Sequence, residues 1–167
     1  MFDIGENEGF ELVEAGVYEA YVSEATAPSN INGKMVSNLS YKIRGDIEGQ
    51  KFAGREIKFD YFSDADNMKW KISALAKALG FFENDATCKV VNGIKKLAFN
   101  SFEEFLNACV NKPLRIEVKQ ELYTDKKGEE KTKVSVVKYD VTEYTDFTAP
   151  VTEMVETDNL EETELPF

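Results

Sequence analysis

The chain has 167 residues, of which 43% are hydrophobic and 12% aromatic, which is enough apolar material for one domain with a buried core. It contains no histidine and only two cysteines, far apart in the sequence, which argues against zinc chemistry and histidine-dependent catalysis. The net charge of −11 argues at first sight against a nucleic-acid partner, and no apolar run approaches the roughly 18 residues that cross a membrane.

The charge is distributed unevenly along the chain. Residues 1–28 and 146–167 each hold seven acids and neither Lys nor Arg, whereas all 20 basic residues lie within 29–145, together with 17 acids. The central part therefore carries a net charge of +3 and can still attract phosphates. The acidic start is unlike a signal peptide, so we expect a cytoplasmic protein whose Cys88 and Cys109 are reduced and buried.

A strand-like run begins at Gly16, and alternating apolar and polar residues follow it between turn signals. They predict five strands, over residues 17–22, 35–44, 54–62, 114–119 and 131–141. Two helices are predicted between the third and fourth strands. The first runs over 67–79 and stops at Gly80, and the second runs over 101–111 behind a capping box of Ser101 and Glu104.

This element order, with a long hairpin between the last two strands, matches an OB-fold, a small Greek-key barrel. We therefore expect a mainly β protein with minor α structure, namely an OB-fold-like five-stranded barrel with a helical insertion between strands 3 and 4. Residues 1–145 would form this domain. Residues 146–167 have too little apolar surface to offset the entropy of ordering, so we expect a disordered acidic tail.

Nothing in the sequence arranges a nucleophile beside a base. The phosphate-loop signature G-x-x-x-x-G-K-[ST] and the nucleophile signature G-x-S-x-G are both absent. We therefore expect no catalytic residue, no metal site and no cofactor, and a binding protein in place of an enzyme.

Two stretches combine cationic and aromatic side chains, which a single-stranded nucleic acid needs for phosphate attraction and base stacking. The predicted last hairpin contributes Tyr123, Lys126, Lys127, Lys131 and Lys133. The second and third strands and the first helix contribute Lys42, Arg44, Arg55, Lys58, Lys69, Trp70 and Lys71. All are candidate nucleic-acid contacts. The alternative for the hairpin is that its lysines only protect a sheet edge from aggregation.

Strand periodicity separates the side chains of the second stretch into two faces. The aromatic residues share faces with apolar neighbours and are expected in the core: Tyr41, Phe59 and Tyr61. Lys42, Arg44 and Lys58 face the other way and are the better candidates for phosphate contact. Trp70 lies off the apolar stripe of its helix, so it either stacks on a base or packs beneath a loop.

The last residues combine acids with an apolar tip: Glu161, Glu162, Glu164, Leu165, Pro166 and Phe167. Such a tip on an acidic tether fits a partner's apolar pocket surrounded by basic residues. The ending resembles the acidic C-terminal tips of bacterial and phage single-stranded DNA-binding proteins, which commonly finish in Pro-Phe or Phe. The alternative is a solubility tail whose final residues are incidental.

Part of the domain also resembles a family of small phage early proteins, formerly of unknown function and usually encoded near recombination or replication genes. The matching residues are Gly16-Val17-Tyr18-Glu19-Ala20-Tyr21-Val22, Arg55-Glu56-Ile57 and Trp70-Lys71-Ile72. The resemblance implies a protein of the host cytoplasm that coats single-stranded DNA with little sequence preference. It would recruit a phage or host recombinase, helicase or polymerase through the tail, with no membrane partner. Whether it forms homo-oligomers stays open.

Two other functions stay open. An acidic protein–protein adaptor or DNA-mimic inhibitor would not bind nucleic acid; the net charge favours it and the lysines within 119–138 argue against it. A magnesium-dependent nuclease has weaker support, because no group of Asp and Glu residues stands out in the sequence.

Overall fold

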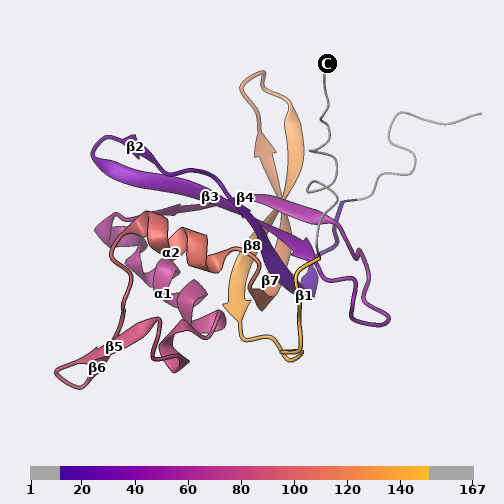
Figure 1. The fold of residues 1–167 in the computed structure, drawn as a ribbon. Coiled ribbons are helices and arrows are strands. Elements are labelled where there is room, and N and C mark those ends of the chain that lie inside the picture. The colour runs from indigo at the N-terminus through magenta and orange to yellow at the C-terminus, as the bar shows by residue number, and fades with distance from the viewer. Residues whose placement is uncertain (1–11, 151–167) are drawn as a thin grey trace, which may run out of the picture.

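The computed structural model describes residues 12–150. One sheet contains β1 (Gly16–Ala25), β2 (Ser29–Ile31), β3 (Lys34–Ile43), β4 (Glu56–Ser63), β7 (Pro113–Thr124) and β8 (Glu130–Asp140) (Figure 1). Between β4 and β7 lie α1 (Lys69–Ala78), α2 (Phe102–Cys109) and a separate two-stranded hairpin of β5 (Cys88–Val91) and β6 (Ile94–Leu97). The expectation of a mainly β protein with minor α structure is confirmed.

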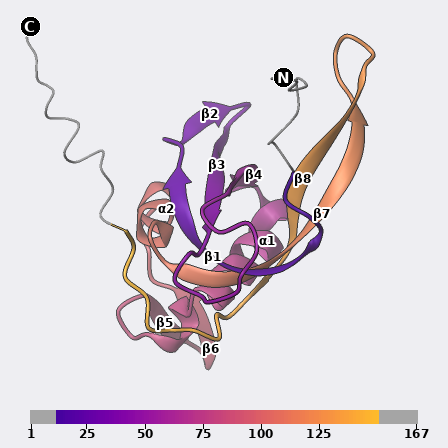
Figure 2. The same ribbon diagram turned by 90° about the vertical axis from the view of Figure 1, so that its right-hand side faces the viewer.

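The large sheet is antiparallel throughout. β1 pairs with β3 on one side and with β7 on the other, β8 pairs with β7, and both β2 and β4 pair with β3. The long path therefore reads β4-β3-β1-β7-β8. Figures 1 and 2 show that the β7–β8 hairpin projects well beyond the body of the sheet, so its outer half is held mainly by its own ladder.

Among residues 12–150, β4 and β8 do not pair as neighbouring strands, and the sheet does not close into a barrel. β8 stays paired with β7 along its length and follows it away from the body of the sheet. A closed OB barrel is thus not confirmed, although the predicted strands and their order along the chain are present. Neither helix of the described part has the length and apolar character needed to cross a bilayer.

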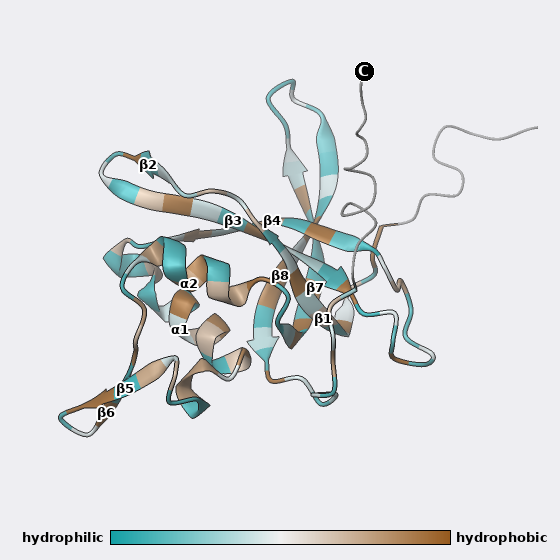
Figure 3. Cartoon of the chain, in the orientation of Figure 1, coloured by the Kyte–Doolittle hydropathy of each residue, from teal (hydrophilic) through white to brown (hydrophobic). Residues whose placement is uncertain are grey.

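The core lies between the sheet and the two helices, which sit on the same side of it (Figure 1). The inward side chains of β1, β3, β4 and β7 meet the apolar stripes of the helices, including Leu75 from α1 and Leu106 from α2, both buried. Figure 3 shows these stripes as brown bands on otherwise pale or teal helices. Burying each large apolar side chain contributes about 1.5–3 kcal/mol, which makes this layer the main source of stability.

The helix boundaries follow the local sequence signals. Gly80 has φ of 80° just after α1, a left-handed conformation that favours glycine. The Ser101 hydroxyl accepts from the Glu104 N–H at 3.1 Å, and the Glu104 carboxylate accepts from the Asn100 N–H at 2.6 Å. The predicted stop of the first helix and the Ser101 cap of the second are confirmed, and the Glu104 carboxylate bonds the N–H of Asn100 in place of that of Ser101. β2 and the β5–β6 hairpin were not predicted.

Candidate nucleic-acid interface

An open cleft of about 590 Å³ lies between β4 and the β7–β8 hairpin. It occurs where the two outer strands of the sheet fail to pair. Three parts of the chain form its walls, namely β4, the hairpin and the segment just before β1. The lining residues are Leu12, Ile57, Lys58, Phe59, Asp60, Tyr123 and 132–136.

A β-bulge in β4 decides which side chains reach the solvent. The register of β4 against β3 shifts between Ile57 and Asp60, so the alternation of inward and outward residues reverses there. Ile57, Asp60 and Phe62 point inward and are buried, whereas Phe59 is 75% exposed and Tyr61 is 46% exposed. The expectation that Phe59 and Tyr61 pack in the core is therefore wrong; only Tyr41 of that group is buried.

Phe59 also adopts an unusual backbone conformation, with φ of 68°. A bulky residue in the left-handed region costs about 1–2 kcal/mol relative to the ordinary conformations. Such strain concentrates at functional sites, where it fixes a side chain in a useful place. At Phe59 the strained backbone, which glycine would adopt more easily, holds a large aromatic ring at the cleft.

Asp60 ties the separated strands together beneath this exposed ring. Its carboxylate is buried and accepts from the hydroxyls of Tyr41 at 2.6 Å and Tyr139 at 2.5 Å, and it forms an ion pair with Lys71 at 2.8 Å. Burial and the nearby carboxylate raise the pKa of both tyrosines, so their hydroxyls stay protonated and donate. β3, β4, β8 and α1 meet at this single carboxylate.

The hairpin supplies the opposite wall. Tyr123 is 41% exposed and the Lys133 ammonium lies 5.9 Å from its ring centroid. The turn is fixed by Asp125, which accepts from the backbone N–H groups of Lys127 and Glu129 and pairs with Lys131. The hairpin is therefore built to present its lysines and Tyr123 at a defined position.

The cleft combines the two chemistries that bind an unpaired nucleic-acid strand. Lys58 on β4 and Lys133 on β8 place cations on opposite walls, and Phe59 and Tyr123 place aromatic rings there. Cations attract phosphates, and each exposed ring offers a face on which a base can stack. Lys58 also lies 3.5 Å from Glu56, an exposed contact that a phosphate can displace at little cost.

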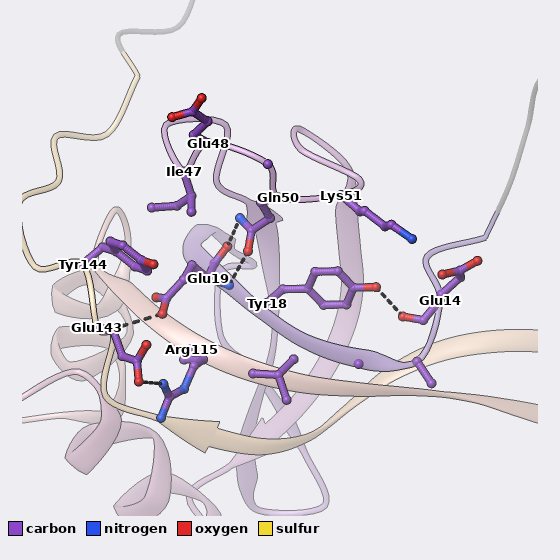
Figure 4. A pocket seen from close by; sticks show the side chains of 14 residues that line it. Glu14, Tyr18, Glu19, Ile47, Glu48, Gln50, Lys51, Arg115, Glu143 and Tyr144 are labelled. Atoms are coloured by element: carbon purple, nitrogen blue, oxygen red, sulfur yellow. Dashed lines mark hydrogen bonds and ion pairs between the residues drawn. The ribbon is translucent and has the colours of Figure 1, made fainter.

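Figure 4 shows a second pocket, of about 550 Å³, along the first half of β1. Gln50 bonds there to both the N–H and the C=O of Glu19, and Arg115 pairs with Glu143 at 2.6 Å. The pocket is lined by four carboxylates and two cations: Glu14, Glu19, Glu48, Glu143, Lys51 and Arg115. This excess of negative charge disfavours phosphate, so the pocket is a poor nucleic-acid site.

A third surface is apolar with a cationic rim. Two adjoining cavities of about 230 and 380 Å³ lie between α1, β6 and α2, and share Lys69, Ile72 and Leu97. Next to them the β5–β6 hairpin exposes Val90, Val91 and Ile94. Figure 3 shows brown, hydrophobic segments on this hairpin. Exposed apolar groups gathered in this way are typical of protein-contact surfaces.

Comparison with protein families identifies a match over residues 1–150, which is most of the chain, to the family described as "Protein of unknown function (DUF669)". The chain belongs to the DUF669 family. A search of curated proteins finds no match.

In this member of the DUF669 family, the predicted contact residues fall into separate groups. Six lie at the cleft or along the hairpin above it: Lys58, Tyr123, Lys126, Lys127, Lys131 and Lys133. Lys42 is half-buried on β3, and the Arg55 guanidinium lies 6.0 Å from the Phe52 ring centroid. Lys69 pairs with Asp66 beside the apolar cavities, and Trp70 is 67% exposed on α1. Of the predicted contacts, the group at the cleft and hairpin is therefore the largest that the structure brings together.

Two of the predicted cations serve the fold. Arg44 is buried; its guanidinium donates to both carboxylate oxygens of Asp46, to the Thr142 hydroxyl and to the carbonyls of Tyr144 and Asp146. The prediction that Arg44 contacts phosphate is wrong, because a guanidinium enclosed by these acceptors has no face left for a ligand. Lys71 is largely buried against Asp60 and the Phe62 ring, so it too is occupied within the protein.

Packing continues past residue 145, where the tail was predicted to begin. The ring centroids of Phe147 and Tyr21 are 5.1 Å apart. The Cζ atom of Arg44 lies over the Phe147 ring, 4.6 Å from its centroid. The predicted partner-binding residues lie outside the described part of the chain: Glu161, Glu162, Glu164, Leu165, Pro166 and Phe167.

Phe59 was missed as a contact because strand periodicity assigned it to the core.

Proposed function

We propose that this protein binds single-stranded DNA, with little sequence preference, in the cleft between β4 and the β7–β8 hairpin. The observation that carries the proposal is the pairing of exposed rings with lysines on both walls of one cleft. The rings need unstacked bases, which a duplex does not offer, so single strands should be preferred. Stacking is possible with every base, which is why sequence preference should be slight.

The strand order supports this proposal. The path β4-β3-β1-β7-β8 has the order of a five-stranded OB-fold left open between its third and fifth strands. We infer an OB-like fold on this ground. In OB-folds the face of strands two and three and the loop between strands four and five contact nucleic acid, and these correspond to β3–β4 and the β7–β8 turn. The bulged part of β4 and the hairpin lysines lie in those positions.

The remaining parts of the proposal rest on the sequence. The protein would coat single-stranded DNA without cleaving it, in the cytoplasm. The acidic segment after residue 150, with Leu165 and Phe167, would recruit a recombinase, helicase or polymerase. Such a segment offers a partner carboxylates for its basic residues and a ring for its pocket.

The decisive experiment is a titration of labelled oligo(dT) with wild type, Phe59→Ala, Tyr123→Ala and the control Tyr144→Ala. Tyr144 is exposed to a similar degree but lines the acidic pocket of Figure 4. Losing one base stack costs about 1–3 kcal/mol, so each cleft variant should bind roughly 5–150-fold more weakly. Tyr144→Ala should bind like wild type. Equal binding by all four proteins, or equal affinity for duplex DNA, would refute the assignment.

The lysines give an independent readout in the salt dependence of binding. Removing one phosphate contact should reduce the slope of log K against log salt by about 0.7 for a single strand. Lys58→Gln and Lys133→Gln should each show this reduction. Lys89→Gln is the matched control, because Lys89 is exposed on β5, away from the cleft. An unchanged slope in both cleft variants would contradict the proposed phosphate contacts.

A second candidate function, a protein adaptor, is favoured by the exposed β5–β6 tip and the adjoining apolar cavities. The same titration separates the two functions, since an adaptor that never touches DNA would leave oligo(dT) unbound even at low salt. The adaptor function also predicts that Ile94→Asp abolishes partner binding while leaving the fold intact, because Ile94 is 60% exposed.

A further inference from the structure

We propose that residues 1–11 act as a tethered acidic competitor for the cleft, occupying it when DNA is absent and leaving it when DNA binds. The inference rests on the proposed function, because it concerns the regulation of the same cleft. It is carried by three observations: where the segment is attached, how far it can reach, and which chemical groups it brings.

The attachment point lies at the cleft. Leu12 is one of the residues that line it. The next residue, Val13, is 3% exposed, and its carbonyl accepts from the Gln120 side-chain amide of β7 at 3.0 Å. The residue after that, Glu14, has a carbonyl that accepts from the Tyr18 hydroxyl at 2.7 Å. These contacts fix the chain beside Leu12, the residue to which the segment is covalently joined.

Covalent geometry limits how far the first residues of the segment can lie from this point. Consecutive Cα atoms are about 3.8 Å apart, so the Cα atoms of Glu11 and Phe10 lie within about 4 and 8 Å of that of Leu12. An acid and an aromatic residue of the segment are therefore within reach of the cleft. The complete segment, fully extended, spans at most about 40 Å, which is ample to follow the cleft.

The segment carries the chemistry that the cleft is built to bind. It contains four acids and neither Lys nor Arg: Asp3, Glu6, Glu8 and Glu11. It also contains Phe2 and Phe10. Its carboxylates can pair with Lys58 and Lys133 in place of phosphates, and its rings can contact Phe59 and Tyr123 in place of bases. Charge complementarity therefore favours this occupant.

Tethering makes even a weak contact effective. A short flexible linker gives an effective concentration in the millimolar range. If the segment binds the cleft with a dissociation constant near 1 mM at an effective concentration of about 5–10 mM, it lowers the apparent DNA affinity about 6–11-fold. The competition is electrostatic, so it should weaken as salt rises.

The test uses the full chain in two variants that change the net charge equally. The first is Asp3→Asn/Glu6→Gln/Glu8→Gln/Glu11→Gln. The matched control is Glu24→Gln/Glu48→Gln/Asp85→Asn/Glu103→Gln, which removes four exposed acids that do not line the cleft. Binding of labelled oligo(dT) is measured by fluorescence anisotropy between low and high salt. We expect the first variant to bind about 5–10-fold more tightly than wild type at low salt, and the control less than about twofold.

The possible outcomes are distinct. Equal tightening by both variants would show a general charge effect and overturn the inference, as would no tightening by the first variant while wild type binds. If none of the proteins binds oligo(dT), the proposed function fails and this inference falls with it. A gain confined to the first variant, disappearing at high salt, supports local competition.

A second measurement needs no substitution. Zero-length carbodiimide cross-linking of wild-type protein, followed by mass spectrometry, should join acids of residues 1–11 to Lys58 or Lys133. Saturating oligo(dT) should suppress these cross-links, while the internal pair Lys71–Asp60 serves as a reference that DNA leaves unchanged. Absence of the cross-links, or their persistence with DNA bound, would overturn the inference.

Discussion

Replacing Asp60 with asparagine should strongly destabilise the protein. One carboxylate oxygen accepts from both Tyr41 and Tyr139, and the other faces the Lys71 ammonium. An amide has a single acceptor oxygen, so the substituted side chain points its NH₂ group either at the ammonium or at the two hydroxyls. Either orientation removes the negative charge of the ion pair and leaves at least one buried donor without an acceptor.

The magnitude follows from burial. Breaking one side of a buried ion pair costs about 3–5 kcal/mol, and an unsatisfied buried donor about 1–3 kcal/mol. The Lys71 side chain is 16% exposed and can recover part of its hydration, so we expect a loss of about 2–4 kcal/mol. This is a large share of the roughly 5–15 kcal/mol typical of a domain.

Urea denaturation followed by tryptophan fluorescence and circular dichroism measures this loss. Asp66→Asn is the matched control, because Asp66 also pairs with a lysine, Lys69 at 3.2 Å, but both side chains are highly exposed. Such a surface pair contributes no more than about 1 kcal/mol. If Asp60→Asn costs no more than Asp66→Asn, the carboxylate does not hold β4, β8 and α1 together as argued.

Three further predictions concern the same region. Above pH of about 10 the free energy of unfolding should fall by up to about 1.36 kcal/mol per pH unit for each of the two tyrosines that bind Asp60, Tyr41 and Tyr139. Their pKa is raised by burial and by the carboxylate, so the unfolded chain releases protons that the folded protein retains. Tyr139→Phe should remove one proton from that slope in pH-dependent denaturation. Phe59→Gly should leave the free energy of unfolding unchanged or raise it by up to about 1 kcal/mol, because glycine relieves the left-handed backbone and Phe59 buries little surface. The same variant should weaken oligo(dT) binding. A clear loss of stability would contradict the proposed backbone strain. Arg44→Lys should lower the free energy of unfolding by about 2–3 kcal/mol, because lysine cannot reproduce the forked contacts with Asp46. It should leave oligo(dT) affinity within about twofold of wild type. A selective loss of DNA binding would instead restore Arg44 to the interface.

The regular elements were predictable where one face of the element is buried. β3 and β7 alternate apolar and polar residues because one face of each lies against the core, whereas β1 is a mainly apolar run that is buried from Tyr18 to Val22. The helix α1 stops where Gly80 permits a left-handed residue. The β5–β6 hairpin gave no such signal, since Val90, Val91 and Ile94 are exposed and face no core. Its turn does carry a local signal in Asn92-Gly93, both with positive φ, which is typical of tight hairpins.

The composition of the site was easier to predict than its geometry. Lysines beside aromatic residues on the last hairpin were correctly placed on one element, because they are close in sequence. Arg44 was misjudged because its burial depends on Thr142 and Tyr144, about a hundred residues further along the chain. The alternation of residues along β3 cannot predict this burial, because Arg44 is covered only when the segment after β8 crosses the end of the sheet.

The bulge in β4 explains why the candidate interface could not be predicted from strand periodicity. Without it, Ile57, Phe59 and Tyr61 would face the core and Asp60 the solvent. The bulge reverses this order after Ile57, so that the carboxylate of Asp60 meets its two hydroxyls and its ammonium while both rings turn outward. The partners of Asp60 thereby offset the strain at Phe59, and the exposure of the rings depends on a buried charge on the opposite side of the strand. A substitution that weakens the Asp60 contacts should therefore disturb the cleft even though Asp60 need not touch the ligand.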